Sequence, residues 1–168
     1  VVNHRTWALV SDGDLMEGIS HESCSLAGHL RLGSLVVIYD DNCITIEGST
    51  CLAYSDNVAK RFEGYNWHVQ SIDGHDLEAA ASALASAKAE KDRPSIIIAR
   101  TRIANGAPNK CGTAEAHGEP LGSDEIKASK TLAGWPLEPD FHVPDEVREL
   151  FAARARELKP EYEAWKSM

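Results

Sequence analysis

The sequence predicts an α/β fold, in which a mainly parallel sheet is doubly wound with helices on both faces. Short apolar runs alternate with helical patterns over residues 6–99, and no tight hairpin turn separates two of these runs. Residues 35–39 read Leu-Val-Val-Ile-Tyr, an unbroken apolar run that is typical of a strand buried on both faces. Strands that are joined through helices pair in parallel through right-handed crossovers.

Each expected strand is an apolar or β-branched run that ends at polar or turn-forming residues. Such runs occupy residues 6–10, 35–39, 68–72 and 95–99. The first expected helix lies between the first two strands and covers residues 17–30. Gly33 is the expected stop signal of this helix, because glycine commonly follows a helix end.

Two more helices are expected inside the alternating part of the chain. Residues 55–65 carry apolar side chains at helical spacing, with Ser55 or Asp56 as the N-cap. Residues 77–91 are rich in alanine, which favours a helix strongly, and Asp76 is the expected N-cap.

The alternation stops after the fourth strand. Residues 101–123 are rich in glycine and proline, and a loop of this length in a compact domain is usually functional or disordered. A helix over 124–132, an extended link over 135–144 and a helix over 145–158 are expected next. Pro160 suits the first turn of a last helical piece.

The composition excludes several classes of function. The 168 residues fit one domain and carry 17 basic against 26 acidic residues, a net charge of −9. Nucleic-acid binding calls for a basic face, so no nucleic-acid partner is expected. No apolar stretch approaches the roughly 18 residues of a membrane span, so no membrane partner is expected either.

The start of the chain and its cysteines bear on where the protein works. Val-Val-Asn-His-Arg is not a signal peptide, and the absence of an initial Met indicates a truncated chain or a fragment. The four cysteines form no Cys-x-x-Cys pair, which favours reduced thiols over a zinc site. A cytoplasmic location is therefore expected.

Oxygen-bearing side chains directly follow two of the expected strands. Asp12 comes just after the first strand and Asn42 just after the second. Ligands bind at the carboxyl ends of strands in open parallel sheets, and an acid with an amide suits a hard divalent cation. Taken singly, Asp12 could equally be a helix cap or turn residue, and Asn42 a turn residue. Asp14 and Asp41 are expected to be turn and solvent carboxylates.

Four longer motifs contain or follow these residues: SDGDLMEGISHE at 11–22, DDNCITIEG at 40–48, APNK at 107–110 and HGEPL at 117–121. Together they resemble the motifs of transketolases, which use thiamine diphosphate, and the resemblance runs over nearly the whole chain. Three positions depart from the family pattern. Ser11 and Cys43 stand where the family usually has glycine, and Ala114 stands where some members have histidine. If position 43 needs a positive φ, Cys43 costs about 1 kcal/mol or more.

The resemblance implies a metal centre and a cofactor site. It assigns Asp12, Asn42 and the backbone carbonyl of Ile44 to Mg²⁺, with Ca²⁺ or another divalent cation as a substitute. Asp12, Gly13 and Asn42 would also bind thiamine diphosphate, since Gly13 has no Cβ and lets the backbone approach the diphosphate. Ile46 would pack near the thiazolium ring, with plain core packing as its alternative.

The resemblance also implies catalytic residues and an oligomer. His117 would reach the diphosphate and the substrate side of the cavity. Glu17 and Glu22 would link two active sites at a dimer interface, where we expect both to be at least partly buried. Their alternative is a helix N-terminus, where acids are ordinary. Lys110 is expected either to meet phosphate or to be a solvated lysine.

The activity that the resemblance implies is the transfer of a two-carbon ketol unit from a ketose phosphate to an aldose phosphate. Residues 1–168 would form part of the diphosphate-binding domain, without the pyrimidine-binding and C-terminal domains. A homodimer, or a partner chain that carries the pyrimidine domain, is expected, and the isolated segment is expected to be inactive. The alternatives are another thiamine-diphosphate enzyme and a non-catalytic or split-enzyme diphosphate-binding module.

Overall fold

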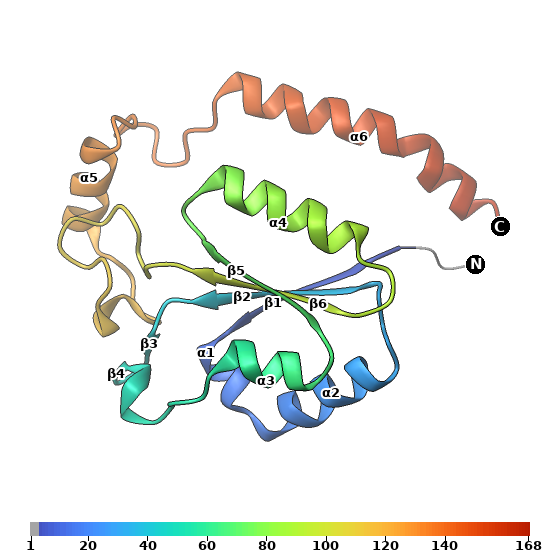
Figure 1. The fold of residues 1–168 in the computed structure, drawn as a ribbon. Coiled ribbons are helices and arrows are strands. Elements are labelled where there is room, and N and C mark those ends of the chain that lie inside the picture. The colour runs from blue at the N-terminus through green and yellow to red at the C-terminus, as the bar shows by residue number, and fades with distance from the viewer. Residues whose placement is uncertain (1–3) are drawn as a thin grey trace.

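The structure is a computed structural model that describes residues 4–168 (Figure 1). Four strands form one sheet in the order β1-β2-β6-β5, and every pair is parallel. The strands are β1 (Thr6–Ser11), β2 (Leu35–Asp41), β5 (His68–Asp73) and β6 (Ser95–Arg100). The four expected strands and their parallel pairing are confirmed, and each extends one or two residues further at its carboxyl end.

Helices cover both faces of this sheet, as expected for a doubly wound fold. On one face lie α1 (Asp12–Met16), α2 (Gly18–His29) and α3 (Val58–Gly64), and on the other lies α4 (Leu77–Ala89) (Figure 1). Successive side chains of a strand point to opposite faces, so β2 and β6 contribute alternate residues to two cores. The α1–α3 face holds the larger core, built around Phe62 and Trp67. The α4 face holds a smaller one that contains Ala83 and Ala87.

The helix expected over 17–30 is confirmed as α2, which covers Gly18–His29. A separate short helix, α1, was not expected, and it begins at Asp12, directly after β1. Its start is fixed locally, because the backbone N–H and the hydroxyl of Ser11 both donate to the Asp14 carboxylate, at 2.8 and 2.9 Å. The helices separate at Glu17, whose backbone is extended.

Gly33 is not the stop signal of α2. Arg31 takes the left-handed conformation after the helix, with φ 55°, and the N–H of Leu32 donates to the Ala27 carbonyl. Gly33 is needed for another reason, since a Cβ there would lie 1.9 Å from the Lys91 carbonyl oxygen.

The N-cap expected for α3 is also wrong. Asn57 caps this helix by accepting a hydrogen bond from the Lys60 N–H at 2.9 Å. Asp56 instead forms an ion pair with Arg61 at 3.5 Å. The cap expected for α4 is confirmed, because the Asp76 carboxylate accepts from two N–H groups of the first turn.

One element contradicts the expectation that hairpins are missing. β3 (Ile44–Thr45) and β4 (Gly48–Ser49) pair antiparallel just beyond β2. A short 3-10 helix, η1 (Thr50–Leu52), follows them. The pairing is only two residues long on each strand, so no run of alternating residues signals it.

The C-terminal part of the chain carries less buried structure. The long loop contains η2 (Ala114–Ala116) and leads to α5 (Ser123–Leu132). The expected extended link is irregular, with turns and bends. α6 (Asp145–Lys166) is one continuous helix with Pro160 inside it, so the separate piece after Pro160 is wrong. Good helix formers on both sides of the proline explain the continuity. No helix of the described part is long and apolar enough to cross a membrane.

We predict that Gly28→Ala destabilises the protein by about 3 kcal/mol, the upper end of the cost of overpacking. A Cβ on Gly28 would lie 1.8 Å from the Tyr65 carbonyl oxygen, so backbone must move. Gly18→Ala in the same helix is the matched control, since nothing lies within 4 Å of its Cβ position. Urea unfolding followed by circular dichroism measures both. Equal stability of the two variants would contradict this packing account.

Candidate metal and diphosphate site

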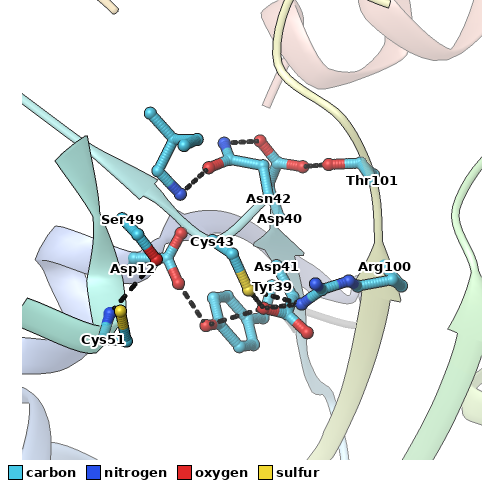
Figure 2. Close-up of polar contacts among 11 residues, drawn as sticks. Asp12, Tyr39, Asp40, Asp41, Asn42, Cys43, Ser49, Cys51, Arg100 and Thr101 are labelled. Atoms are coloured by element: carbon cyan, nitrogen blue, oxygen red, sulfur yellow. Dashed lines mark hydrogen bonds and ion pairs between the residues drawn. The ribbon is translucent and has the colours of Figure 1, made fainter. Parts of the chain in front are cut away.

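The carboxyl ends of β1 and β2 bring the two expected ligands to one edge of the sheet. Ser11 pairs with Asp40 in the parallel register, so Asp12 and Asn42 leave neighbouring strands on the same side. Figure 2 shows the two side chains in separate networks of polar contacts, Asp12 with Tyr39 and Asn42 with Asp40. The carboxyl ends of the strands are where ligands bind in an open parallel sheet.

Asp12 is a buried carboxylate with one oxygen in use. Its exposed fraction is 2%, and its Oδ1 accepts a hydrogen bond from the Tyr39 hydroxyl at 2.6 Å (Figure 2). Its Oδ2 is buried and has no hydrogen-bond partner within the described residues. Burial raises the pKa of Asp12 against the lowering effect of the Tyr39 hydrogen bond, and the Asp41 and Asp40 charges raise it further. A buried acceptor among other carboxylates fits a bound cation.

Asn42 is held in one orientation by its neighbours. Its Nδ2 donates to Asp40 Oδ2 at 3.1 Å, and its Oδ1 accepts from the backbone N–H of Ile44 at 2.9 Å. Asp40 is held in turn by the hydroxyl of Thr101 at the end of β6. The amide oxygen therefore stays beside the backbone of Ile44, where the resemblance places the third metal ligand.

Cys43, which stands between Asn42 and Ile44 in the sequence, takes a left-handed conformation, with φ 61°. The positive φ anticipated for this position is therefore present, and a residue with a Cβ is strained there. The Cys43 thiol contacts the Asp41 carboxylate and the Arg100 guanidinium, and Asp41 and Arg100 form an ion pair at 3.2 Å. Asp41 is thus not the solvent carboxylate that was expected, since its side chain is only 22% exposed.

Two hollows lie at the carboxyl end of the sheet. One has a volume of about 310 Å³, and its lining includes Asp12, Tyr39, Cys43 and residues that precede and begin α3. The lining of the other, of about 610 Å³, includes Asn42, Arg100 and residues that follow β5 and β6. Asp12 and Asn42 therefore line different hollows.

The remaining residues that the resemblance singles out lie on the surface. Gly13 is exposed, and a Cβ there would meet nothing closer than the Ser11 hydroxyl at 4.0 Å. Ile46 is 71% exposed, in the turn between β3 and β4. Glu17 and Glu22 are exposed in the single chain, which leaves their expected burial in a dimer untested.

His117 is exposed in the long loop, which lies on the same side of the sheet as the ends of β2 and β6 (Figure 1). Its backbone N–H donates to the Ala114 carbonyl at 2.9 Å. Among the residues described, its ring forms no hydrogen bond with Asp12 or Asn42, so the structure does not join His117 to the proposed ligands.

A buried glutamate anchors that loop. Glu125 in the first turn of α5 is 8% exposed. Its carboxylate accepts three hydrogen bonds, from the backbone and side chain of Asn109 and from the backbone of Lys110, at 2.7, 2.8 and 3.0 Å. These bonds, led by that from the Asn109 side chain, lower the pKa of Glu125. The APNK motif is therefore tied to α5 by one side chain.

Several residues at this edge were missed by sequence reasoning. Tyr39 belongs to an apolar run and was interpreted as strand core. Asp40, Arg100 and Thr101 are polar residues at strand ends, a signal that was used for Asp12 and Asn42 but not for them. Glu125 gave no such signal, because an acid in a first helical turn is ordinary.

Comparison with known proteins agrees with this geometry. A family profile described as "Transketolase, thiamine diphosphate binding domain" matches residues 1–168. The chain belongs to the transketolase family. It is 51% identical over 157 residues to the chromosomal transketolase of Cupriavidus necator. This match covers 93% of the chain and 23% of that relative.

Solved transketolase structures share the fold. A Campylobacter jejuni transketolase superposes with a TM-score of 0.93 at 42% identity, over 99% of the chain and 26% of the solved protein. A Pichia stipitis transketolase, solved in complex with sedoheptulose-7-phosphate, has a TM-score of 0.91 at 38% identity, over 98% and 25%. The chain thus spans about a quarter of the length of the relatives that it matches.

We predict that Cys43→Gly stabilises the protein by about 0.5–1 kcal/mol. Relief of the left-handed strain gives about 1–2 kcal/mol, and the greater freedom of glycine in the unfolded chain offsets part of it. Cys43→Ala keeps the strain while removing the thiol, so it is the matched control. Denaturant unfolding measures both. A Cys43→Gly variant no more stable than Cys43→Ala would show that strain at this turn is negligible.

We predict that Glu125→Gln lowers the free energy of unfolding at neutral pH, by an amount that depends on pH. The folded-state pKa of Glu125 is lowered, so its stabilising contribution is present above the unfolded-state value of about 4.3. It is lost as the pH falls through the folded-state pKa. The gap between wild type and variant should therefore shrink below about pH 4. Glu119→Gln changes an exposed loop glutamate and serves as the control. A gap independent of pH would contradict the assignment.

Proposed function

We propose that this chain forms the part of a transketolase that binds a divalent cation and the diphosphate of thiamine diphosphate. The observation that carries the proposal is the buried Asp12 carboxylate. One of its oxygens is unpartnered within the described residues, at the carboxyl edge of a domain whose family binds this cofactor. Mg²⁺ suits the site, because it binds one or two carboxylates together with phosphate oxygens. Ca²⁺ or another divalent cation would be a substitute.

Individual residues of this chain would hold the cation and the diphosphate, each in a defined role. Asp12 would offset the cation's charge, while the Asn42 amide and the Ile44 carbonyl would supply neutral oxygens. Gly13 would give the diphosphate access to the backbone, since its Cα carries no side chain. When bound, thiamine diphosphate supplies the carbanion chemistry, and the protein supplies orientation and electrostatics.

The activity proposed for the complete protein is transfer of a two-carbon ketol unit between sugar phosphates. The family assignment supports it, as does the Pichia stipitis relative that was solved with sedoheptulose-7-phosphate. Such a reaction belongs to pentose phosphate metabolism, and a cytoplasmic location is proposed with it. The exposed His117 would face the diphosphate and the substrate once the remaining parts of the enzyme are in place.

A dimer, or a partner chain with the pyrimidine-binding domain, is proposed to complete the catalytic site. Glu17, Glu22 and Ile46 are exposed in the single chain, which fits residues that meet a further protein surface. The chain would then be inactive alone. Residues 1–168 would form one diphosphate-binding unit, without the pyrimidine-binding and C-terminal domains.

We predict that Asp12→Asn abolishes Mg²⁺-dependent binding of thiamine diphosphate, because the carboxylate supplies the charge that holds the cation. Isothermal titration with cofactor, with and without Mg²⁺, measures the effect. Asp14→Asn is the control, because it removes a carboxylate of the same helix that bonds to Ser11 instead. Cofactor affinity that is unchanged in Asp12→Asn would exclude the proposed metal site.

A second arm of this experiment separates catalysis from binding alone. The chain is mixed with the pyrimidine-binding and C-terminal domains of a transketolase relative, and ketol transfer between sugar phosphates is assayed. Turnover that appears only on mixing supports a part of a catalytic enzyme. Cofactor binding without turnover would favour a non-catalytic module.

A further inference from the structure

We propose that Tyr39 is a positioning residue, whose hydroxyl turns the Asp12 carboxylate so that one of its oxygens is presented to a divalent cation. The inference rests on the proposed function, since it assumes that Asp12 binds the cation. It adds a residue that contacts neither the cation nor the cofactor. It also explains why a tyrosine follows four aliphatic residues in β2.

The geometry of the hydrogen bond carries the inference. Tyr39 is 3% exposed, and its hydroxyl donates to Asp12 Oδ1 at 2.6 Å. The contact between the same hydroxyl and Asp41 Oδ1 is much longer, at 3.4 Å. A tyrosine hydroxyl has one proton to donate, and the short distance assigns it to Asp12. The bond occupies one carboxylate oxygen and leaves Oδ2 buried and unpartnered within the described residues.

The surroundings explain why such a hydrogen bond is needed. Asp40 and Asp41 place further negative charge near Asp12, and the adjoining hollow of about 310 Å³ leaves room for its carboxylate to turn. A carboxylate already held in one orientation loses less conformational freedom when it binds a cation. Groups that hold a metal ligand in place commonly raise metal affinity without touching the metal.

The same hollow provides a matched control. Tyr54 also lines it, and the Tyr54 hydroxyl is buried without a hydrogen-bond partner among the described residues. Tyr54→Phe and Tyr39→Phe therefore remove the same atom from the same hollow. They differ in that only Tyr39 is hydrogen-bonded to Asp12.

The test titrates Mn²⁺ into each variant in the presence of thiamine diphosphate, with free Mn²⁺ followed by electron paramagnetic resonance. Tyr39→Phe should weaken Mn²⁺ binding by about 10–100-fold, the range found for groups that support a metal ligand. Tyr54→Phe should leave the affinity unchanged. Asp12→Asn is included, and it should remove Mn²⁺ binding altogether.

A second measurement separates positioning from a merely structural role. The unfolding temperature of each variant is recorded with and without Mn²⁺ and cofactor. A structural role would lower it equally in both conditions, whereas positioning reduces the rise that the cation produces. If Tyr39→Phe does not fold, Tyr39→Met fills the core with a flexible apolar side chain that has no N–H or O–H donor, and its cation-induced rise should be reduced in the same way.

The outcomes distinguish the inference from the proposed function. If Asp12→Asn loses Mn²⁺ while Tyr39→Phe binds it like the wild type, the positioning role is overturned and the metal site stands. If Asp12→Asn binds Mn²⁺ normally, the metal site itself is wrong. A wild-type chain that takes up no Mn²⁺ would overturn both.

Discussion

The in-register parallel pairing of β1 with β2 determines where the residues of the candidate site lie. Ser11 stands opposite Asp40, so the chain leaves both strands at the same level. Tyr39 and Asp40 are consecutive and point to opposite faces of the sheet, so Tyr39 reaches Asp12 while Asp40 bonds to Asn42 and Thr101. A shift of one residue between β1 and β2 would exchange these faces relative to Asp12 and separate it from Tyr39.

The same pairing concentrates negative charge at one edge. Asp41 is balanced by Arg100, and Asp40 is held by the neutral groups of Asn42 and Thr101. Asp12 has a tyrosine hydroxyl as its side-chain partner, and burial raises its pKa. A carboxylate in this position is costly to keep charged unless a cation comes to it. Either a proton or a cation can relieve this cost, and the unpartnered Oδ2 is the atom that would accept it.

Sequence reasoning located the strands because apolar and β-branched runs reflect burial on both faces of a parallel sheet. It missed α1, because Ser11 and Asp14 resemble turn residues, and the two hydrogen bonds that Ser11 donates to Asp14 appear only in the folded chain. Sequence reasoning could not identify the partners of Asp40 and Asp41, for a different reason. Thr101 and Arg100 lie 61 and 59 positions along the chain from the residues that they contact, and only the neighbouring strand β6 brings them there. Tyr39 was counted as core because its ring is core, although its hydroxyl has a separate partner.

The proposed site residues divide into two groups by burial, and the division has a physical consequence. Asp12 and its hydrogen-bond partner Tyr39 are buried within this chain, so the orientation of this proposed ligand is fixed without help from another surface. Ile46 and His117, in contrast, are exposed. Ile46 lies in the turn between β3 and β4, and His117 lies in the long loop. Exposed apolar side chains such as Ile46 gain stability only when another surface covers them. Cation binding should therefore be a property of this chain alone. Turnover, in contrast, should require further protein surfaces that cover Ile46 and His117.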